Sequence, residues 1–163
     1  YAEVHAIEQA LAETGAKVEF KKVWAGDFND PSKARQLADA LIAEGYDVIM
    51  GSLNLGMFGV FEAVKASSKP VLVTAKYTDK TTFAPKNYLT SLIYDFAGPL
   101  KEIYKNIQAG KTGGYYPLGF NTGVLIQTPL QNTTAEVSKA MEPIIADLKS
   151  GKITVKKDTT EVK

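Results

Sequence analysis

The sequence predicts an α/β domain of three layers, in which helices cover both faces of a mostly parallel sheet. In the first half, amphipathic helical segments alternate with short apolar strands, an order typical of parallel sheets. The first two predicted helices each end at a glycine, Gly15 and Gly45, as helices commonly do. The chain has 163 residues, a length sufficient for one domain with a buried core. Its composition, 45% hydrophobic and 23% charged, is that of an ordinary globular protein.

The first half divides into helices and strands in strict alternation. In order, we expect a helix over about 2–14, a strand over 18–24 (VEFKKVW), a helix over about 31–44, a strand over 47–50, a helix over about 58–66 and a strand over 70–75. Asp30 is placed to cap the second helix and Pro31 to occupy its first turn. Ligand sites of such sheets lie in loops at the carboxyl ends of the strands, which here begin at Ala25, Gly51 and Lys76.

The second half has a different pattern. We expect a strand over 88–93, a helix over about 96–109, a strand over 124–127, a helix up to about 150 and an edge strand over 153–155. Gly113-Gly114 is placed to turn a hairpin between Tyr115-Tyr116 and the strand at 124–127. Thr133 and Glu136 predict a capping box for the last helix, and Gly151 ends it.

Composition excludes several classes of function. The chain has no cysteine, so disulfides, thiol nucleophiles and cysteine-ligated metals are absent. A net charge of +1 argues against nucleic acid as a partner. No apolar run approaches the roughly 20 residues of a membrane span. The first residues (YAEVHAIEQA) have neither an initiator Met nor a signal peptide, so we expect a longer parent protein.

Candidate catalytic, cofactor and metal sites are weak. The single histidine, His5, has no second group nearby in sequence to work with. The triplet at 110–112 (GKT) would need a glycine at 105 to complete a P-loop, and that position is Lys105. A flavodoxin-like enzyme remains as an alternative only if Asp27 and Lys76 converge in a cleft. We therefore predict no catalytic residue, no cofactor and no metal.

Aromatic residues near the predicted strand ends are more informative. They are Trp24, Phe28, Phe58, Tyr77 and Tyr94. A flat ring is a common wall of a small-molecule cleft, because it supplies stacking and apolar area with little loss of entropy. The alternative for Trp24 and Phe58 is burial in the core, where large aromatic side chains often lie.

Several segments, in order, resemble the basic membrane protein family of substrate-binding lipoproteins, which includes purine nucleoside receptors. The matching segments are WAGDFNDPSKA at 24–34, the stretch 46–66 with DVIM and GVFEAVK, VLVTAKYTDK at 71–80, NYLTSLI at 87–93 and the closing LKSGKITV. The resemblance covers nearly the whole chain. It implies a type I periplasmic-binding-protein lobe, flavodoxin-like in topology, whose partner lobe is absent.

The resemblance also implies a function without chemistry. A small ligand would be clamped between two lobes and delivered to ABC permease subunits, by a lipoprotein anchored outside the cell or in the periplasm. Residues 1–87 would form the ligand-binding lobe, and 88–163 the crossing strand, helix and return segment that complete it. The expected ligand-binding positions, including the aromatic Phe58, are Phe28, Met50, Asn54, Gly56, Phe58, Tyr77 and Tyr94.

Two positions depart from the family pattern. Tyr77 stands where the family has a ribose-binding aspartate, and Tyr94 where it has a lysine; a shift of one residue would instead place Lys76 at the first position. A phenol replaces neither a carboxylate nor an ammonium well. We therefore expect weak binding of typical nucleosides and better binding of a less polar or aromatic ligand.

The helix at 96–109 has no obvious partner within a single lobe. In such folds it would cover the missing lobe, and its apolar stripe is Leu100, Ile103 and Ile107. In this chain we expect the stripe to dock on the lobe itself or on a second copy, which would give a homodimer. An intracellular ligand-sensing domain and a structural interaction module are the alternatives to a receptor, since related lobes also serve regulators.

Overall fold

One four-stranded sheet organises the protein. The computed structural model describes residues 1–162, so the last residue of the expected segment 88–163 lies outside them. The strands are β1 (Val48–Met50), β2 (Leu72–Tyr77), β3 (Tyr88–Tyr94) and β4 (Val124–Ile126), in spatial order β1-β2-β3-β4. β1, β2 and β3 run parallel, and β4 pairs antiparallel with β3. The predicted mostly parallel sheet is confirmed.

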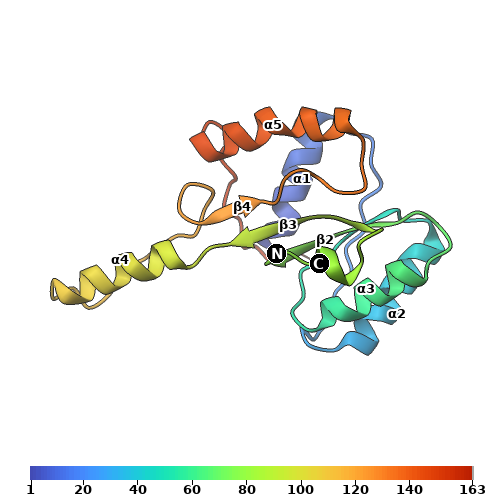
Figure 1. The fold of residues 1–163 in the computed structure, drawn as a ribbon, viewed down its shortest axis with the longest axis horizontal. Coiled ribbons are helices and arrows are strands. Elements are labelled where there is room, and N and C mark those ends of the chain that lie inside the picture. The colour runs from blue at the N-terminus through green and yellow to red at the C-terminus, as the bar shows by residue number, and fades with distance from the viewer. Residues whose placement is uncertain (163) are drawn as a thin grey trace.

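Helices cover both faces of this sheet, as predicted. Figure 1 shows α2 (Pro31–Glu44) and α3 (Gly56–Ala66) together on one side, with α1 (Ala2–Thr14) and α5 (Ala135–Ser150) on the other. A short 3-10 helix, η1 (Thr81–Phe83), follows β2. Within the described residues, no helix has the length and apolar composition that crossing a membrane requires.

The core lies between the sheet and the pair α2 and α3. Val73 and Ala75 of β2 and Phe61 and Val64 of α3 are at most 2% exposed. The two helices approach closely at Gly59, where a Cβ atom would lie 1.9 Å from the carbonyl oxygen of Pro31. Only glycine therefore permits this contact, which fixes α3 and the loop that precedes it.

Most predicted helix ends are confirmed. The Asp30 carboxylate accepts a hydrogen bond from the Lys33 N–H at 2.9 Å, and Gly45 follows the helix in a left-handed conformation. The predicted cap of α5 is wrong by one residue, because Thr134 and not Thr133 caps the helix by accepting from the Val137 N–H. The helix begins at Ala135, and Thr134 immediately before it has the extended backbone that an N-cap needs.

The predicted strand at 18–24 is wrong. This segment lies outside the sheet and is held by side chains instead. Lys21 binds Glu44 of α2 at 2.5 Å, and Lys22 binds Glu8 of α1 at 3.0 Å. Because residues 18–24 do not pair with β1, β1 is an edge strand of the sheet.

Two further strand predictions are also wrong. Residues 153–155 form no strand, because the Ile153 N–H donates to the Asp147 carbonyl and extends the end of α5. The hairpin expected from Gly113-Gly114 is absent from the described residues, and Tyr116 instead accepts a hydrogen bond from Asn106 at 3.0 Å. At Ile153 the end of α5 therefore uses a backbone N–H that a strand would have paired.

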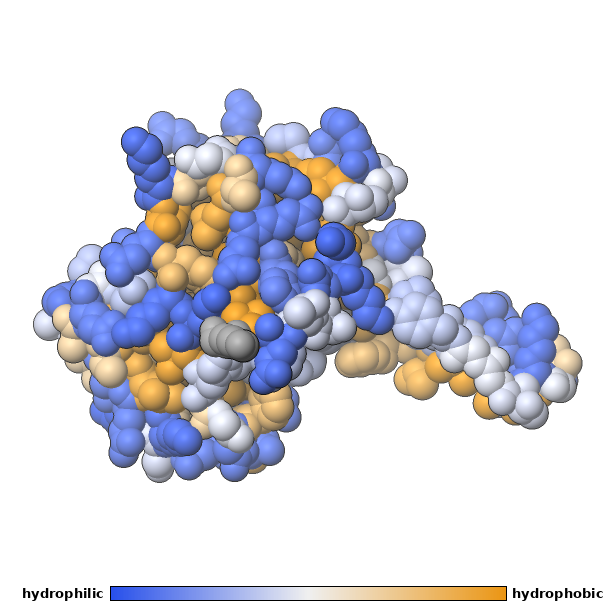
Figure 2. Space-filling view, turned by 180° about the vertical axis from the view of Figure 1, so that it is seen from behind, coloured by the Kyte–Doolittle hydropathy of each residue, from blue (hydrophilic) through white to orange (hydrophobic). Residues whose placement is uncertain are grey.

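The helix α4 (Ala97–Gln108) projects away from the rest of the molecule (Figure 1). Its apolar residues Leu100, Tyr104 and Ile107 are each more than 60% exposed. Figure 2 shows apolar side chains along one side of this arm. Of the two partners expected for the stripe, the lobe itself or a second copy, the lobe does not cover it, and the apolar face of α4 remains exposed in the single chain.

Candidate ligand site at the carboxyl edge of the sheet

The carboxyl ends of the three parallel strands form a stepped edge. Met50, the last residue of β1, pairs with Thr74, so β2 continues three residues further to Tyr77. Tyr77 in turn pairs with Ile93, and Tyr94 ends β3 one residue later. The stepped edge exposes the last residues of β2 and β3.

Two tyrosine rings meet at the top of this step. Tyr77 and Tyr94 lie edge to face, with centroids 5.2 Å apart and an interplanar angle of 87°. Tyr94 makes a second edge contact with Phe96 at 6.1 Å. Burial, and then the neighbouring Tyr77, raises the pKa of the Tyr94 hydroxyl, so that hydroxyl is neutral at physiological pH. These three aromatic residues form a partly exposed wall.

The backbone of Tyr77 has an unusual conformation. Its φ is 76°, in the left-handed region that side chains other than glycine, asparagine and aspartate rarely adopt. A left-handed residue breaks the strict alternation of a strand, and here the ring reaches its neighbour on β3. Strained residues of this kind are concentrated at functional sites.

The loop after β1 is tied to the segment before α2. The N–H groups of Asn54 and Gly56 both donate to the Phe28 carbonyl at 3.0 Å. A Cβ atom at Gly56 would lie 3.0 Å from the same oxygen, so the close approach favours glycine. Gly56 itself is buried, whereas the Phe28 ring is 62% exposed and Asn54 is also exposed.

The other two predicted positions have different surroundings. Met50 is 61% exposed and points away from the core, because its neighbour Ile49 is the buried residue of β1. Phe58 packs edge-on against Phe83 of η1 at 5.0 Å and stays 38% exposed. The structure thus connects Phe28 with Asn54 and Gly56, and Tyr77 with Tyr94, while Met50 and Phe58 lie in neither group.

Lys76 is the one charged side chain of β2, and its surroundings were not predicted. Its Nζ donates to the Ser52 hydroxyl at 3.0 Å and to the Glu3 carboxylate of α1. The side chain is only 15% exposed, and burial lowers the pKa of its ammonium group. The sequence signal was a lysine within an otherwise apolar strand, which needs a partner when it is buried.

The alternative of a flavodoxin-like enzyme needed Asp27 and Lys76 in one cleft. Instead, Asp27 accepts a hydrogen bond from the Asn29 N–H at 2.8 Å, whereas Lys76 is bound to Ser52 and Glu3. Among residues 1–162, no cluster of three or more acidic or histidine side chains could hold a metal ion. The converging titratable pair required for that alternative is not formed in the described part of the chain.

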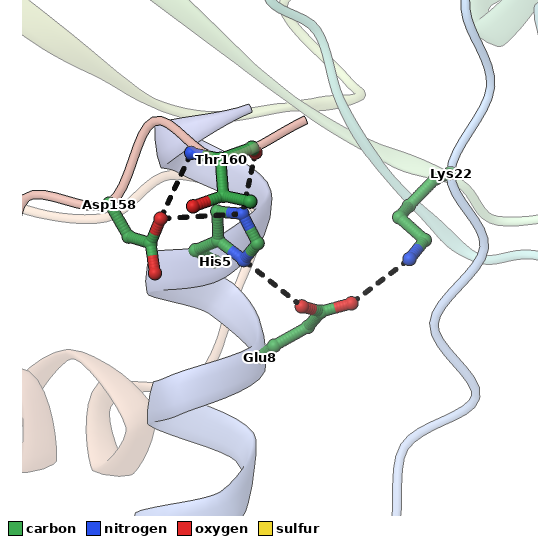
Figure 3. A network of polar contacts seen from close by, with 5 residues as sticks. All are labelled: His5, Glu8, Lys22, Asp158 and Thr160. Carbon is green, nitrogen blue, oxygen red and sulfur yellow. Dashed lines mark hydrogen bonds and ion pairs between the residues drawn. The ribbon is translucent and has the colours of Figure 1, made fainter. Parts of the chain in front are cut away.

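His5 contacts the C-terminal segment. Its Nε2 lies 2.9 Å from the Thr160 carbonyl oxygen and 3.9 Å from Asp158 (Figure 3). On the other side of the ring, Nδ1 lies 3.6 Å from Glu8, which also binds Lys22. This network joins α1 to the segment at 18–24 and to the C-terminal segment at 158–160.

A hollow of about 530 Å³ adjoins Tyr94 on the α5 face of the sheet. Its lining is mostly apolar and includes Leu92, Phe120 and Leu148. The loops that carry Phe28 and Asn54 do not line it. The candidate site is therefore an open edge with an aromatic wall, and not an enclosed pocket.

Known proteins resemble this chain in sequence. A family model described as "ABC transporter substrate-binding protein PnrA-like" matches residues 10–158. Basic membrane protein B of Borreliella burgdorferi is 30% identical over 122 residues, which cover 69% of this chain and 36% of that protein. Its counterpart in Borrelia garinii is 29% identical over the same length. The chain thus spans about a third of the curated relatives it matches.

Solved structures share the fold at low sequence identity. An ABC transporter solute-binding protein from Aeropyrum pernix K1 has a TM-score of 0.72 at 17% identity, covering 91% of this chain and 51% of that one. A second, from Conexibacter woesei, has a TM-score of 0.65 at 16% identity. A structure titled as a transcriptional activator of the comK gene from Bacillus halodurans has a TM-score of 0.64 at 21% identity. These matches establish the architecture alone.

Proposed function

The chain belongs to the Bmp family of ABC transporter substrate-binding proteins, and from this premise we propose that it is one lobe of the solute-binding component of an importer. The observation that carries the proposal is the partly exposed Tyr77–Tyr94 pair at the carboxyl edge of the parallel strands. Open α/β sheets bind ligands outside this edge. The proposed site performs no chemistry.

The shape of the site supports a clamp. A small-molecule site commonly buries most of its ligand, whereas this edge is open on one side. A second lobe would close over the ligand, with Phe28, Asn54, Tyr77 and Tyr94 on this side of the cleft. Since a single lobe covers only part of a ligand, we expect weak binding by this chain alone.

Most side chains of the proposed site are aromatic, and this supports a proposal about the class of ligand. Tyr77 and Tyr94 offer faces and edges to a planar ring, with hydroxyls that form neutral hydrogen bonds. We propose a less polar or aromatic solute in preference to a typical nucleoside. The proposed partners of the full-length protein are permease subunits, and its proposed location is outside the cell or in the periplasm, anchored as a lipoprotein.

The exposed face of α4 supports a second lobe in the parent protein. An apolar stripe of this kind is normally covered in a folded protein. We propose that the other lobe covers it in the parent and that a second copy covers it in the isolated chain. An intracellular sensor remains the alternative function, because one structural neighbour is titled a transcriptional activator.

Calorimetry on the two-lobed parent protein tests this proposal. A panel of nucleosides, aromatic acids and aromatic amines would be screened, and the best ligand measured against Tyr77→Ala and Tyr94→Ala. Each ring should contribute about tenfold in affinity, since aromatic contacts are worth roughly 1 kcal/mol beyond area burial. Tyr115→Ala is the matched control, because Tyr115 is 78% exposed and outside the strand edge. Unchanged affinity in both site variants would reject the site.

A further inference from the structure

Lys76 lies where the proposed solute site meets the rest of the lobe. It is the residue immediately before Tyr77, and its partner Ser52 lies in the loop that follows β1. Both side chains therefore belong to the carboxyl edge of neighbouring parallel strands. The Ser52 hydroxyl accepts from Lys76, so its own proton is available to a further acceptor.

The third member of the group comes from the first turn of α1. Glu3 belongs to α1, a helix without any fully buried residue and without a side-chain cap at its start. Its apolar residues Val4, Ile7 and Leu11 are partly buried. Three polar contacts also tie the helix to the rest of the chain: Glu3 to Lys76, His5 to Thr160, and Glu8 to Lys22. The Glu3 side chain is 55% exposed, although the lysine it binds is only 15% exposed. Because the Glu3 side chain is mostly exposed and lies in the first turn of α1, it can rotate away from Lys76 without moving the helix.

We propose that Lys76 and Ser52 form a carboxylate-binding subsite of the solute site, and that the Glu3 carboxylate occupies this subsite as an internal competitor. The inference rests on the proposed function for the position of the solute, and it adds the chemical class: a solute with an aromatic ring and a carboxylate. The ring contacts Tyr77 and Tyr94 while the carboxylate displaces Glu3.

Burial of the lysine explains why the subsite needs an anion. Burial removes the Lys76 ammonium from water and lowers its pKa. A buried ammonium without a paired charge is costly, so an anion at this position stabilises it. Glu3 supplies the charge in the present conformation. A solute carboxylate would supply it equally well and would also gain the neighbouring aromatic wall. Lys76 is therefore paired with a carboxylate both before and after the exchange.

Nuclear magnetic resonance on the ¹⁵N-labelled chain tests the subsite directly. Benzoate is the probe, and benzyl alcohol is the uncharged control with the same ring. Glu3→Gln removes the competing charge while keeping the shape of the side chain. We expect this variant to bind benzoate about fivefold more tightly than the unmodified chain, with shifts at Ser52 and Lys76. Glu13→Gln, on the same helix, should leave the affinity unchanged, because the Glu13 carboxylate accepts a hydrogen bond from Gln9 of that helix.

Adding Lys76→Met to Glu3→Gln should abolish the benzoate-induced shifts, because the ammonium is lost and the apolar stem is kept. In the unmodified chain, benzoate should move the Glu3 signal together with those of Ser52 and Lys76, a result independent of any effect of the variants on α1. The inference is overturned if Glu3→Gln does not tighten binding, if the double variant retains it, or if Glu3 stays unmoved. A parent protein that binds no solute would reject the proposed function while leaving this result on the single lobe intact.

Discussion

The ring of Tyr77 stands edge-on to Tyr94, with centroids 5.2 Å apart. The first tyrosine ends β2 and the second ends β3, so one contact joins the carboxyl ends of two neighbouring parallel strands. The left-handed backbone at Tyr77 accompanies this contact. The proposed ligand preference and the strained backbone therefore both depend on Tyr77.

The first prediction concerns ligand preference. In the two-lobed parent, inosine and guanosine should bind more weakly than micromolar, because a phenol accepts ribose hydroxyls less strongly than a carboxylate. Tyr77→Asp should improve inosine binding about tenfold, since a hydrogen bond to a charged group is worth about 1.5–3 kcal/mol. Titration calorimetry measures both. Micromolar binding of inosine by the unmodified protein would contradict the prediction.

The second prediction concerns the strained backbone. Tyr77→Asn and Tyr77→Val both remove the ring, but asparagine tolerates a φ of 76° far better than a β-branched residue does. The valine variant should therefore be less stable than the asparagine variant by about 1–2 kcal/mol in urea unfolding. Equal stability of the two variants would show that the left-handed conformation is not maintained in solution.

The third prediction concerns the contact between α2 and α3. In Gly59→Ala the new Cβ would meet the Pro31 carbonyl oxygen at 1.9 Å, so the helices must separate. We expect a loss of about 2–4 kcal/mol in the free energy of unfolding, from overpacking and disturbed core contacts. Gly113→Ala is the control, because its Cβ would meet nothing within 4 Å. Similar losses in both variants would refute the close-contact explanation.

Local sequence signals predicted most of the helices. Asp30-Pro31 and Gly45 define the ends of α2 because capping depends on neighbouring residues alone. Strand pairing depends on partners far away in sequence, and this is where prediction failed. Residues 18–24 have the composition of a strand, but Lys21 and Lys22 bind carboxylates on two helices. No local pattern reveals those partners.

The candidate site was only partly foreseeable. The rule that ligands bind at strand carboxyl ends pointed to Tyr77 and Tyr94, which the structure brings into contact. The link between Lys76 and Glu3 spans 73 positions, so their sequence spacing gave no sign of it. The left-handed φ of Tyr77 was also unpredictable, because tyrosine has no intrinsic preference for it.

The fourth prediction concerns pH. Hydrogen bonds from Thr81, first from its side chain and then from its backbone, lower the pKa of the Asp79 carboxyl. The ordinary pKa of an aspartate is 3.8, so as the pH falls the unfolded chain binds this proton before the folded chain does. The stabilisation is lost as the pH falls through the lowered pKa of the folded chain. Asp79→Asn keeps an acceptor but cannot ionise. The stability difference between the unmodified chain and this variant should be constant at neutral pH and shrink below 3.8.

Urea unfolding at several acidic pH values measures that difference. Thr81→Val is a useful companion, because it removes the side-chain hydrogen bond to Asp79 that has an oxygen–oxygen distance of 2.6 Å and keeps the backbone one. The stability that Thr81→Val loses relative to the unmodified chain should also become smaller as the pH falls. A difference that stays constant from neutral to acidic pH would contradict the assignment of the pKa shift.

The fifth prediction concerns the uncovered face of α4. Leu100 and Ile107 are 61% and 62% exposed, and burying each against a second copy would contribute roughly 1.5–3 kcal/mol. The isolated chain should therefore dimerise with rising concentration in sedimentation experiments. Leu100→Ser with Ile107→Ser should weaken this association by at least about tenfold, because most of the buried apolar area is lost. Lys101→Ser, on the same helix but outside the stripe, should leave it unchanged. A chain that stays monomeric at about millimolar concentration would show that α4 needs a different partner, and would leave the second lobe of the parent as the candidate.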